Sequence, residues 1–351
     1  MILLRAKVPL PAKVTLRITG NTMGNNLLPK HIKHITVPPV KCQGIKTKLV
    51  NFIASSISWE GKGRWIEPFL GSGVAAFNIL APKALLADTN PHIINLYRQI
   101  QKREIDRNTV KEFLEFHGAK LEKGDGDYYY EIREQFNRTK DPLLFLFLNR
   151  ASFNGLMRFN ANGNFNVPYN HKPNRFSKAY ISKICNQVST LQDILMCVDW
   201  EFITAPWEHT IAQANANDFV YLDPPYIGRS SDYYNSWSYE DALKLSTQIH
   251  SLPCGYAMSM WLKNKYRTNE YIENFRTKDE IFSFNHFYHI GASETLRNSI
   301  VEALIIKPGY SNKQNFGNVK LYLQEEIALD NMWDKKSQND LYSQRLHRFH
   351  R

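Results

Sequence analysis

Aspartate and glutamate are missing from the first 59 residues, and a second acid-free stretch separates Asp141 from Asp193. Over the whole chain, 44 Lys and Arg stand against 33 Asp and Glu, which gives a formal net charge of +11. For the first stretch taken alone, a solvated basic face is the favoured explanation. Two separate basic segments favour a polyanionic partner, because both segments could contact its phosphates.

Cysteine is also scarce, because the chain has only four, and none of them forms a CxxC pair. The sequence therefore indicates neither a zinc site nor a disulfide framework. Apolar runs long enough to span a bilayer are absent, and charges and prolines interrupt the amino-terminal segment where a secretory signal would need an apolar stretch. We expect a protein without bound metal or membrane contact, in a reducing, cytoplasmic setting.

The remaining composition, 43% hydrophobic and 13% aromatic, is sufficient for a substantial core. Residues 1–36 lack clear periodicity and are expected to form a basic arm. Residues 37–95 and 206–308 alternate between strand-like and helix-like segments, which predicts an α/β fold with a doubly wound, mainly parallel sheet. A helix is expected to begin at Pro91, and strands are predicted at 84–88, 218–222, 256–260, 280–288 and 299–306. Residues 96–205 are expected to form an inserted domain that contacts DNA, with helices at 128–137 and 176–196 and a β-hairpin between them. Residues 309–351 are expected to form a polar tail.

The tetrapeptide Asp223-Pro224-Pro225-Tyr226 follows a predicted strand, at the sheet edge where open α/β folds place their active sites. The exocyclic amine of adenine is a weak nucleophile because its lone pair is delocalised into the ring. A carboxylate and a proline-fixed backbone carbonyl could accept its two N–H groups, while a tyrosine ring stacks on the extruded base. A simple strand-ending turn is the alternative, since Asp-Pro is common in turns. The preceding buried strand favours the catalytic interpretation.

A glycine-rich turn, Phe69-Leu70-Gly71-Ser72-Gly73, joins a predicted strand to a helix upstream. Glycines allow a ligand to approach the backbone closely, and Asp88 at the end of the next strand could accept both ribose hydroxyls of a nucleoside-like cofactor. Taken alone, the turn could be a tight turn without a ligand. Ala76 stands where a dinucleotide-binding motif would have its third glycine, which argues against a pyrophosphate.

The segment 156–167 predicts a two-stranded hairpin, because Asn162-Gly163 is flanked by alternating residues. A ribbon of this kind fits the major groove, where Arg and Asn side chains read guanine and adenine edges. The alternative is an ordinary hairpin whose phenylalanines pack on the core, but the acid-free surroundings favour DNA. The polar side chains of the region that could read bases are Arg150, Asn154, Arg158 and Asn166.

Together these motifs resemble the Dam-type, alpha-group (D12 class) DNA adenine N6-methyltransferases. The resemblance rests on the two motifs at 69–73 and 223–226 and on the block 148–160 with its continuation 165–168. It extends over roughly residues 36–308. It implies a class I methyltransferase type of fold, S-adenosylmethionine as cofactor, and methyl transfer to a flipped adenine of double-stranded DNA by a monomeric enzyme.

The resemblance also implies roles for residues of the cofactor site. Lys46 contacts the cofactor carboxylate, Gly71 and Gly73 line the methionine end, and Asp88 binds the ribose. Cys42 stands where the family has an aromatic residue. Asp223 holds the adenine amine beside the methyl donor. The expected cofactor-binding set is therefore Cys42, Lys46, Phe69, Gly71, Gly73, Asp88 and Asp223.

For DNA, the resemblance implies that Lys41 touches a guanine and that Phe153 wedges into the base stack. Leu156, Arg158 and Pro168 match base-contacting positions, and Arg150 and Asn154 complete the expected DNA-binding set.

Further segments at 37–50, 172–176, 226–229 and 286–294 resemble a subgroup that modifies GATATC, which implies methylation of the first adenine. The enzyme would then have a cognate restriction endonuclease as a genetic partner, or it would be an orphan methyltransferase without one. The alternatives are methylation of cytosine N4 or of an RNA adenine, and a catalytically inactive DNA-binding subunit.

Overall fold

The computed structural model describes residues 27–29, 31–124, 126–226, 237–263, 268–275, 278–287, 299–312 and 320–321. Most of the predicted arm and tail lie outside these residues. The chain divides into two compact units, Met1–Tyr256 and Ala257–Arg351. The domain boundaries expected from the sequence, at 37, 96, 206 and 309, stay predictions.

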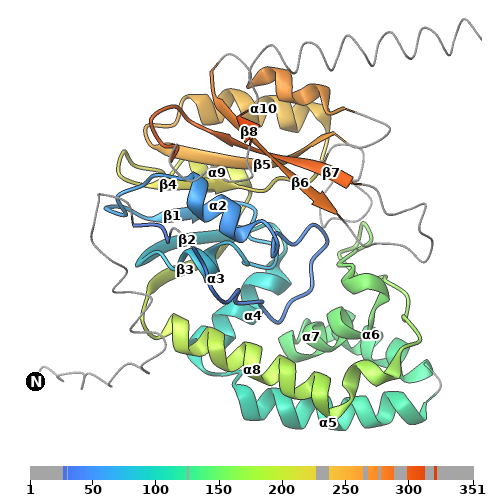
Figure 1. Ribbon diagram of the computed structural model, residues 1–351. Coiled ribbons are helices and arrows are strands. Elements are labelled where there is room, and N and C mark those ends of the chain that lie inside the picture. Colours follow the sequence, from blue (N-terminus) through green and yellow to red (C-terminus); the bar gives the residue numbers. More distant parts are fainter. Residues whose placement is uncertain are drawn as a thin grey trace, which may run out of the picture. The chain divides into compact units, whose positions relative to one another are not determined.

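The first unit contains four parallel strands in the order β3-β2-β1-β4 (Figure 1). Strands β1 and β4 are buried at every position, as expected for a parallel sheet covered on both faces. The strands predicted at 84–88 and 218–222 are confirmed to within one residue. Their bounds are β1 Trp65–Glu67, β2 Lys83–Asp88, β3 Asp199–Thr204 and β4 Phe219–Leu222.

Helix α4, Pro91–Lys102, begins where the sequence predicts, with proline at its first position and the Asn90 side chain accepting from His92 N. It contacts β2 and β3 as well as two helices of the insertion, α7 and α8. It therefore connects the sheet to the inserted domain. The other helices near the strands are α2 Val50–Ser56, α3 Ala76–Ile79, α9 Trp207–Ile211 and α10 Tyr239–His250.

The insertion is helical, and its helices lie together, apart from β1–β4 (Figure 1, bottom). Asp106 and Asp141 cap the first and third of them by accepting backbone N–H groups. The helices predicted at 128–137 and 176–196 are confirmed with slightly different ends. The bounds are α5 Arg107–Lys123, α6 Asp127–Thr139, α7 Pro142–Ala151, η1 Phe153–Gly155, η2 Pro173–Phe176 and α8 Lys178–Leu195. No helix in the described part of the chain is long and apolar enough to cross a bilayer.

The predicted hairpin is present as a turn, but regular strands do not continue from it. Gly163 has a φ of +70°, and the flanking segments meet in one bridge, Phe159↔Phe165. The Asn160 side chain accepts from the backbone N–H groups of Asn162 and Asn164, which tightens the loop. Two backbone hydrogen bonds also cross it, from Asn160 N to Asn164 O at 2.9 Å and from Asn166 N to Arg158 O at 3.1 Å. The Phe165 side chain is only 1% exposed. This ring therefore packs on the core, as the alternative interpretation of the hairpin expects.

In the second unit, β7 lies between β5 and β6 and is antiparallel to both. Strands β5 and β6 therefore run in the same direction. The predicted strands at 256–260, 280–288 and 299–306 are confirmed over their described residues, and the expected α/β fold of the class I methyltransferase type is confirmed. The bounds are β5 Gly255–Lys263, η4 Glu270–Asn274, β6 Glu280–Phe287, β7 Ser299–Ile306 and β8 Lys320–Leu321.

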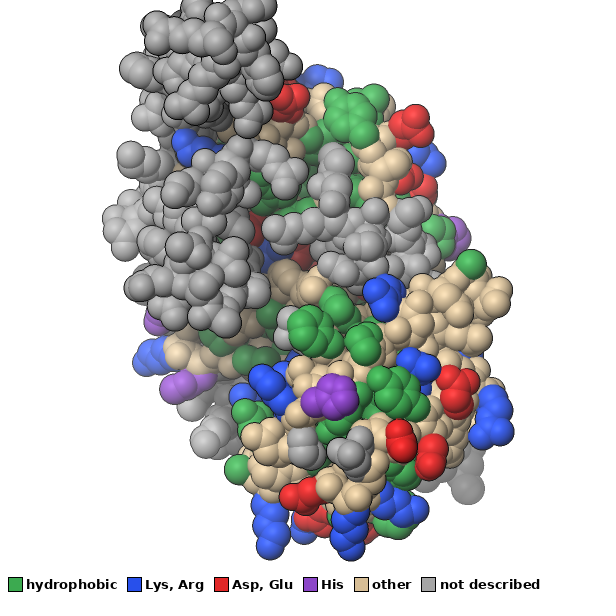
Figure 2. All heavy atoms as spheres, turned by 90° about the vertical axis from the view of Figure 1, so that its right-hand side faces the viewer, with side chains coloured by type: hydrophobic (Ala, Val, Ile, Leu, Met, Phe, Trp, Pro, Cys, Tyr) green, Lys and Arg blue, Asp and Glu red, His purple; other side chains and the backbone are tan. Residues whose placement is uncertain are grey.

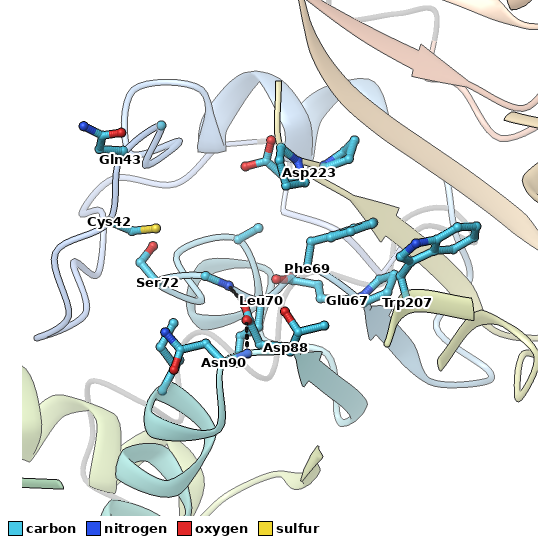
Figure 3. A pocket seen from close by; sticks show the side chains of 18 of the residues that line it. Cys42, Gln43, Glu67, Phe69, Leu70, Ser72, Asp88, Asn90, Trp207 and Asp223 are labelled. Atoms are coloured by element: carbon cyan, nitrogen blue, oxygen red, sulfur yellow. Dashed lines mark hydrogen bonds between the residues drawn. The ribbon is translucent and has the colours of Figure 1, made fainter. Parts of the chain in front are cut away.

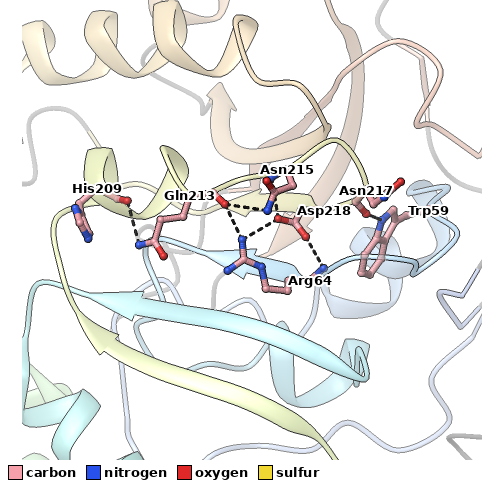
Figure 4. Close-up of polar contacts among 7 residues, drawn as sticks. All are labelled: Trp59, Arg64, His209, Gln213, Asn215, Asn217 and Asp218. Carbon is pink, nitrogen blue, oxygen red and sulfur yellow. Dashed lines mark hydrogen bonds and ion pairs between the residues drawn. The ribbon is translucent and has the colours of Figure 1, made fainter.

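A polar network fixes the amino-terminal ends of β1 and β4 relative to each other (Figure 4). Arg64 Nη2 lies 3.0 Å from Asp218 Oδ2, and Arg64 N donates to Asp218 Oδ1 at 2.6 Å. The Trp59 indole donates to the Asn217 carbonyl at 3.0 Å. Because the two strands are parallel, this network also sets where their opposite ends lie, and those ends carry Glu67 and Asp223.

We expect Asp218→Asn to lower the free energy of unfolding by about 2–4 kcal/mol, because the substitution leaves Arg64 without its ionic partner. Burial alone would raise the pKa of Asp218, but hydrogen bonds from Arg64 and Asn215 outweigh it and hold the pKa below the ordinary value. The contribution is therefore present above about pH 4 and is lost as the pH falls through the lower folded pKa.

Urea unfolding at pH 7 and pH 3 measures both effects, and the wild type should lose more stability than Asp218→Asn over this interval. Glu60→Gln, at an exposed pair with Lys62, is the matched control and should cost under about 0.5 kcal/mol. Equal pH dependence in wild type and Asp218→Asn would contradict the assignment.

Candidate active site

A cavity of about 300 Å³ lies at the carboxyl ends of β1, β2 and β4. The face drawn in Figure 2 is hollowed, with acidic and basic side chains visible inside the hollow. Four chain segments line the cavity, and they include most residues predicted for the cofactor and the catalytic step. These segments are 42–46, 67–75 without Gly73, 88–90 and 223–226, joined by Trp207 and Trp237. Gly73, which was predicted to bind the cofactor, is therefore not brought to the cavity wall.

The glycine-rich turn has a conformation that side chains would disturb. Gly71 and Gly73 have φ values of +50° and +71°, in the left-handed region. A Cβ on Gly73 would lie 2.9 Å from the Phe77 ring, and one on Gly71 would lie 3.4 Å from Cys42 Sγ. Gly73 is therefore needed for the close packing of the turn on Phe77, whereas Gly71 lines the cavity and leaves room opposite Cys42.

Asp88, at the end of β2, faces this turn (Figure 3). Its Oδ2 accepts from Gly71 N at 2.8 Å and its Oδ1 accepts from Asn90 N at 2.8 Å. Burial raises the pKa of Asp88, although these backbone N–H groups oppose the shift. Each carboxylate oxygen has two lone pairs, so the group can still accept hydroxyls from a ribose.

Lys46 lies beside Asp223 and Tyr226, which are far from it in sequence. Its Nζ is 2.9 Å from Asp223 Oδ1, 3.0 Å from the Tyr226 hydroxyl and 3.2 Å from the Gly44 carbonyl. Lys46 is 3% exposed, whereas the Asp223 side chain is 25% exposed. The structure thus brings the predicted cofactor lysine against the predicted catalytic carboxylate, which still reaches the cavity.

The rest of the tetrapeptide continues from β4 along the cavity. Pro224 is buried, and Pro225 and Tyr226 are half-buried. Both prolines and the tyrosine line the cavity with Asp223. The four predicted catalytic residues therefore share one wall of the cavity, opposite Asp88 (Figure 3).

Glu67 is a site residue that the sequence analysis missed. It is the last residue of β1, is buried and lines the cavity, and its Oε1 accepts from the Trp65 indole at 2.6 Å. Burial raises the pKa of Glu67 to about 8, so the carboxyl is largely protonated at neutral pH and can donate as well as accept. An acid that ends a short apolar strand directly before the glycine turn is a signal that could have identified it.

Aromatic rings form the far side of the cavity from Cys42 (Figure 3). Phe69 stacks with Trp207 at a centroid distance of 6.5 Å and meets Trp237 edge-on at 5.5 Å. The two tryptophans were not predicted, because their positions in sequence carry no motif. A flat apolar wall of this kind suits a nucleobase or another planar ring.

The residues predicted to contact DNA lie on the insertion and on the segment before α2. Lys41 is tied to the buried Asn149 side chain, which accepts from Lys41 N and donates to Lys41 O, both at 2.8 Å. Arg158 donates to the Asn166 side chain at 2.9 Å and to its carbonyl at 3.2 Å. Leu156 is half-buried.

Phe153 is 48% exposed, and its N–H donates to the carbonyl of the exposed Pro168 at 3.2 Å. These two residues therefore lie side by side on the surface. Arg150, in contrast, is 6% exposed. Asn154 belongs to η1, and its side chain lies outside the described part of the structure.

Comparisons with known proteins agree with this geometry. A family model for D12 class N6 adenine-specific DNA methyltransferases matches residues 43–295. The Retron Ec67 DNA adenine methylase of Escherichia coli is 34% identical over 185 residues, which cover 51% of this chain and 60% of the relative. The DNA adenine methylase of Serratia marcescens is 32% identical over 203 residues, 53% of this chain and 68% of the relative.

A more distant relative is similar over a longer stretch. The Type II methyltransferase M.MjaIII of Methanocaldococcus jannaschii is 28% identical over 261 residues, 66% of this chain and 85% of the relative. The match with the Escherichia coli protein, in contrast, spans less than two thirds of that relative's length.

Proposed function

Because the chain belongs to the family of D12 class N6 adenine-specific DNA methyltransferases, we propose that it methylates N6 of an adenine flipped out of double-stranded DNA. One observation supports this most directly. The Asp223 carboxylate and the Gly71–Asp88 cradle line the same cavity, so an amine acceptor and a nucleoside site lie together.

The residues of the cavity fit S-adenosylmethionine as the cofactor. Asp88 would accept the ribose hydroxyls, Gly71 would leave room for the methionine end, and Phe69 with the two tryptophans offers a flat wall for a base. Gly73 would act through the shape of the turn, because it packs on Phe77 and does not line the cavity. The volume of about 300 Å³ is at the lower end of the range for small-molecule sites. When bound, the cofactor supplies an electrophilic methyl group.

Asp223 and the Pro224 carbonyl would accept the two N–H groups of the adenine amine. These acceptors stabilise the positive charge that grows on nitrogen as the new C–N bond forms. The carboxylate can keep Lys46 on one oxygen while it accepts the amine, because each oxygen has two lone pairs. Lys46 then positions Asp223, Tyr226 stacks on the flipped base, and the surplus proton on N6 leaves to solvent.

The target and cellular context are further parts of this proposal. The segments at 37–50, 172–176, 226–229 and 286–294 resemble the EcoRV modification methyltransferase, which supports GATATC as the recognition site and its first adenine as the methylated base. We also propose a monomer in the cytoplasm that protects DNA from a cognate restriction endonuclease. In this arrangement the insertion reads the sequence and the cavity performs the chemistry.

Arg158→Ala is expected to reduce discrimination between GATATC and a random duplex by roughly 10- to 100-fold, and to change non-specific affinity little. The structure places Arg158 on one arm of the turn, where Asn166 on the other arm orients its guanidinium. Fluorescence anisotropy with both duplexes measures the ratio. Arg138→Ala, at an exposed position on α6, is the control that removes the same charge. An equal loss on both duplexes would refute base reading by Arg158.

Nucleoside mass spectrometry tests the reaction itself. DNA incubated with the protein and S-adenosylmethionine should gain N6-methyladenine, and RNA under the same conditions should not. N4-methylcytosine in DNA, or methylated adenine in RNA alone, would overturn the assignment. DNA binding without any methylated nucleoside would identify the chain as a binding module.

A further inference from the structure

Glu67 is the buried carboxyl group of the cavity, and the proposed reaction leaves it without a role. It is 2% exposed, ends β1 and lines the cavity with the half-buried Asp88 and Asp223 (Figure 3). Its Oε1 accepts from the Trp65 indole at 2.6 Å. None of the ion pairs among the described residues includes Glu67. A carboxylate buried in this way is costly unless a cation accompanies it.

The charged groups of the cavity do not supply that cation. In the described part of the lining, Lys46 is the one Lys or Arg, and its Nζ already lies 2.9 Å from Asp223 Oδ1. The cavity is therefore negatively charged, although the whole chain has a net charge of +11. Besides Glu67, the carboxylates that line it are Asp88, Asp223, Glu208 on α9 and Asp241 on α10.

The other titratable side chains around Glu67 add no positive charge. Burial raises the pKa of the Cys42 thiol, before α2, to about 12. Burial also raises the pKa of the Tyr97 hydroxyl, on α4, well above its ordinary value. Tyr221, on β4, stacks on Trp65 with ring centroids 5.7 Å apart. A thiol or a phenol is neutral or negative, so none of the three can compensate the charge of a carboxylate.

These surroundings decide the protonation of Glu67. Burial raises its pKa to about 8, and repulsion from Asp223 adds to the rise, whereas hydrogen bonds from the Trp65 indole and the Ala76 N–H oppose it. The carboxyl is therefore largely protonated at neutral pH in the free protein. A ligand that brings a positive charge into the cavity would reverse this balance, because an opposite charge nearby favours the ionised form.

We propose that Glu67 makes the cavity prefer the methyl donor to the demethylated product, because its carboxyl ionises beside a sulfonium and stays protonated beside a thioether. The inference rests on the proposed cofactor. S-Adenosylmethionine carries one more positive charge than S-adenosylhomocysteine, since loss of the methyl group turns the sulfonium into a neutral thioether. Glu67 would release its proton to solvent when the donor binds and take a proton from solvent after the transfer.

This preference depends on pH in a defined direction. A ligand that lowers the pKa of Glu67 binds more tightly as the pH rises towards the free-protein value of about 8, and its affinity is constant above that value. The ratio of donor affinity to product affinity should therefore rise roughly 5- to 50-fold from pH 6 to pH 8.5. Ionisation of Asp88 acts on the ribose, which both ligands contain, so it cancels in this ratio.

Calorimetric titration of the wild type in buffers of different ionisation enthalpy counts the protons that leave on binding. At pH 7, about 0.5–1 proton should leave for each S-adenosylmethionine bound, and fewer than about 0.2 for each S-adenosylhomocysteine. Equal proton release for the two ligands would overturn the proposal, and this comparison needs no variant.

Glu67→Gln assigns the proton to one residue. Glutamine keeps the shape and an acceptor for the Trp65 indole but cannot ionise, so the extra proton release should disappear and the affinity ratio should no longer rise with pH. Titration of the ligand's own amine would persist in this variant and is thereby separated. Glu201→Gln, at an exposed position of β3, is the matched control and should release protons like the wild type. Undiminished release in Glu67→Gln would refute the role of Glu67.

The titrations contain no DNA, so they are independent of methyl transfer. N6-methyladenine formation together with equal proton release for both ligands would refute the role of Glu67 and leave the enzymatic function standing. Absence of binding for both ligands would refute the cofactor assignment and the role of Glu67 together.

Discussion

Asp223→Ala is expected to reduce the rate of methyl transfer by at least about 10²–10³-fold, the range seen when one preorganised polar group is removed from an active site. The substitution removes the carboxylate that accepts one amine N–H. The positive charge that grows on N6 is then no longer stabilised by a nearby negative charge. The substitution leaves the insertion intact, so affinity for DNA should change by less than about threefold. Single-turnover methylation and anisotropy measure the two quantities.

Two further variants make this result specific. Asp223→Asn keeps the shape and one acceptor oxygen, and should retain more activity than alanine. Glu60→Gln changes an exposed carboxylate that pairs with Lys62 and does not line the cavity, so it should stay within about threefold of the wild-type rate. A rate for Asp223→Ala above a tenth of wild type would exclude the carboxylate as the amine acceptor.

Asp88→Ala is expected to weaken cofactor binding by about 100-fold or more, since two hydroxyl hydrogen bonds to a charged acceptor are lost. The change also leaves the N–H groups of Gly71 and Asn90 without their acceptor, which loosens the cradle. Calorimetric titration with S-adenosylhomocysteine measures the affinity. Asp199→Ala, at the opposite end of the neighbouring strand β3, is the control and should bind like the wild type.

The same site has an expected dependence on pH. Burial raises the pKa of Asp88, and only the ionised carboxylate can accept both hydroxyls. Cofactor affinity should therefore be full at high pH and should fall as the pH drops through that raised pKa, at a higher pH than an ordinary aspartate would give. Asp88→Asn should remove this dependence, and if it did not, another group would be responsible.

The local motifs were predictable because each needs only a few neighbouring residues. The turn at 69–73 and the tetrapeptide at 223–226 both follow buried strands, and the parallel sheet brings their ends together. The contact of Lys46 with Asp223 could not be predicted in this way, because 177 residues separate the two positions (223 − 46) and no pattern links them. The same holds for Trp207 and Trp237.

The turn in the insertion shows that a strong local sequence signal can predict a chain reversal without predicting the structure on either side of it. Asn162-Gly163 predicted the reversal of the chain correctly. The flanking residues did not extend into strands: they meet in one bridge between Phe159 and Phe165, and the Phe165 ring packs into the core. Alternation in the sequence could not distinguish a ribbon presented to DNA from a short loop anchored by its rings.

The clasp between Asn149 and the Lys41 peptide group has a consequence for engineering. It joins helix α7 of the insertion to the segment 41–46, which continues into the cavity, and Gly155 allows close approach because a Cβ there would lie 2.6 Å from Lys41 Cβ. A chimera that exchanges only residues 96–205 with a relative would cut across this joint. Transplanting a new sequence preference should therefore require residues 37–46 from the same donor protein.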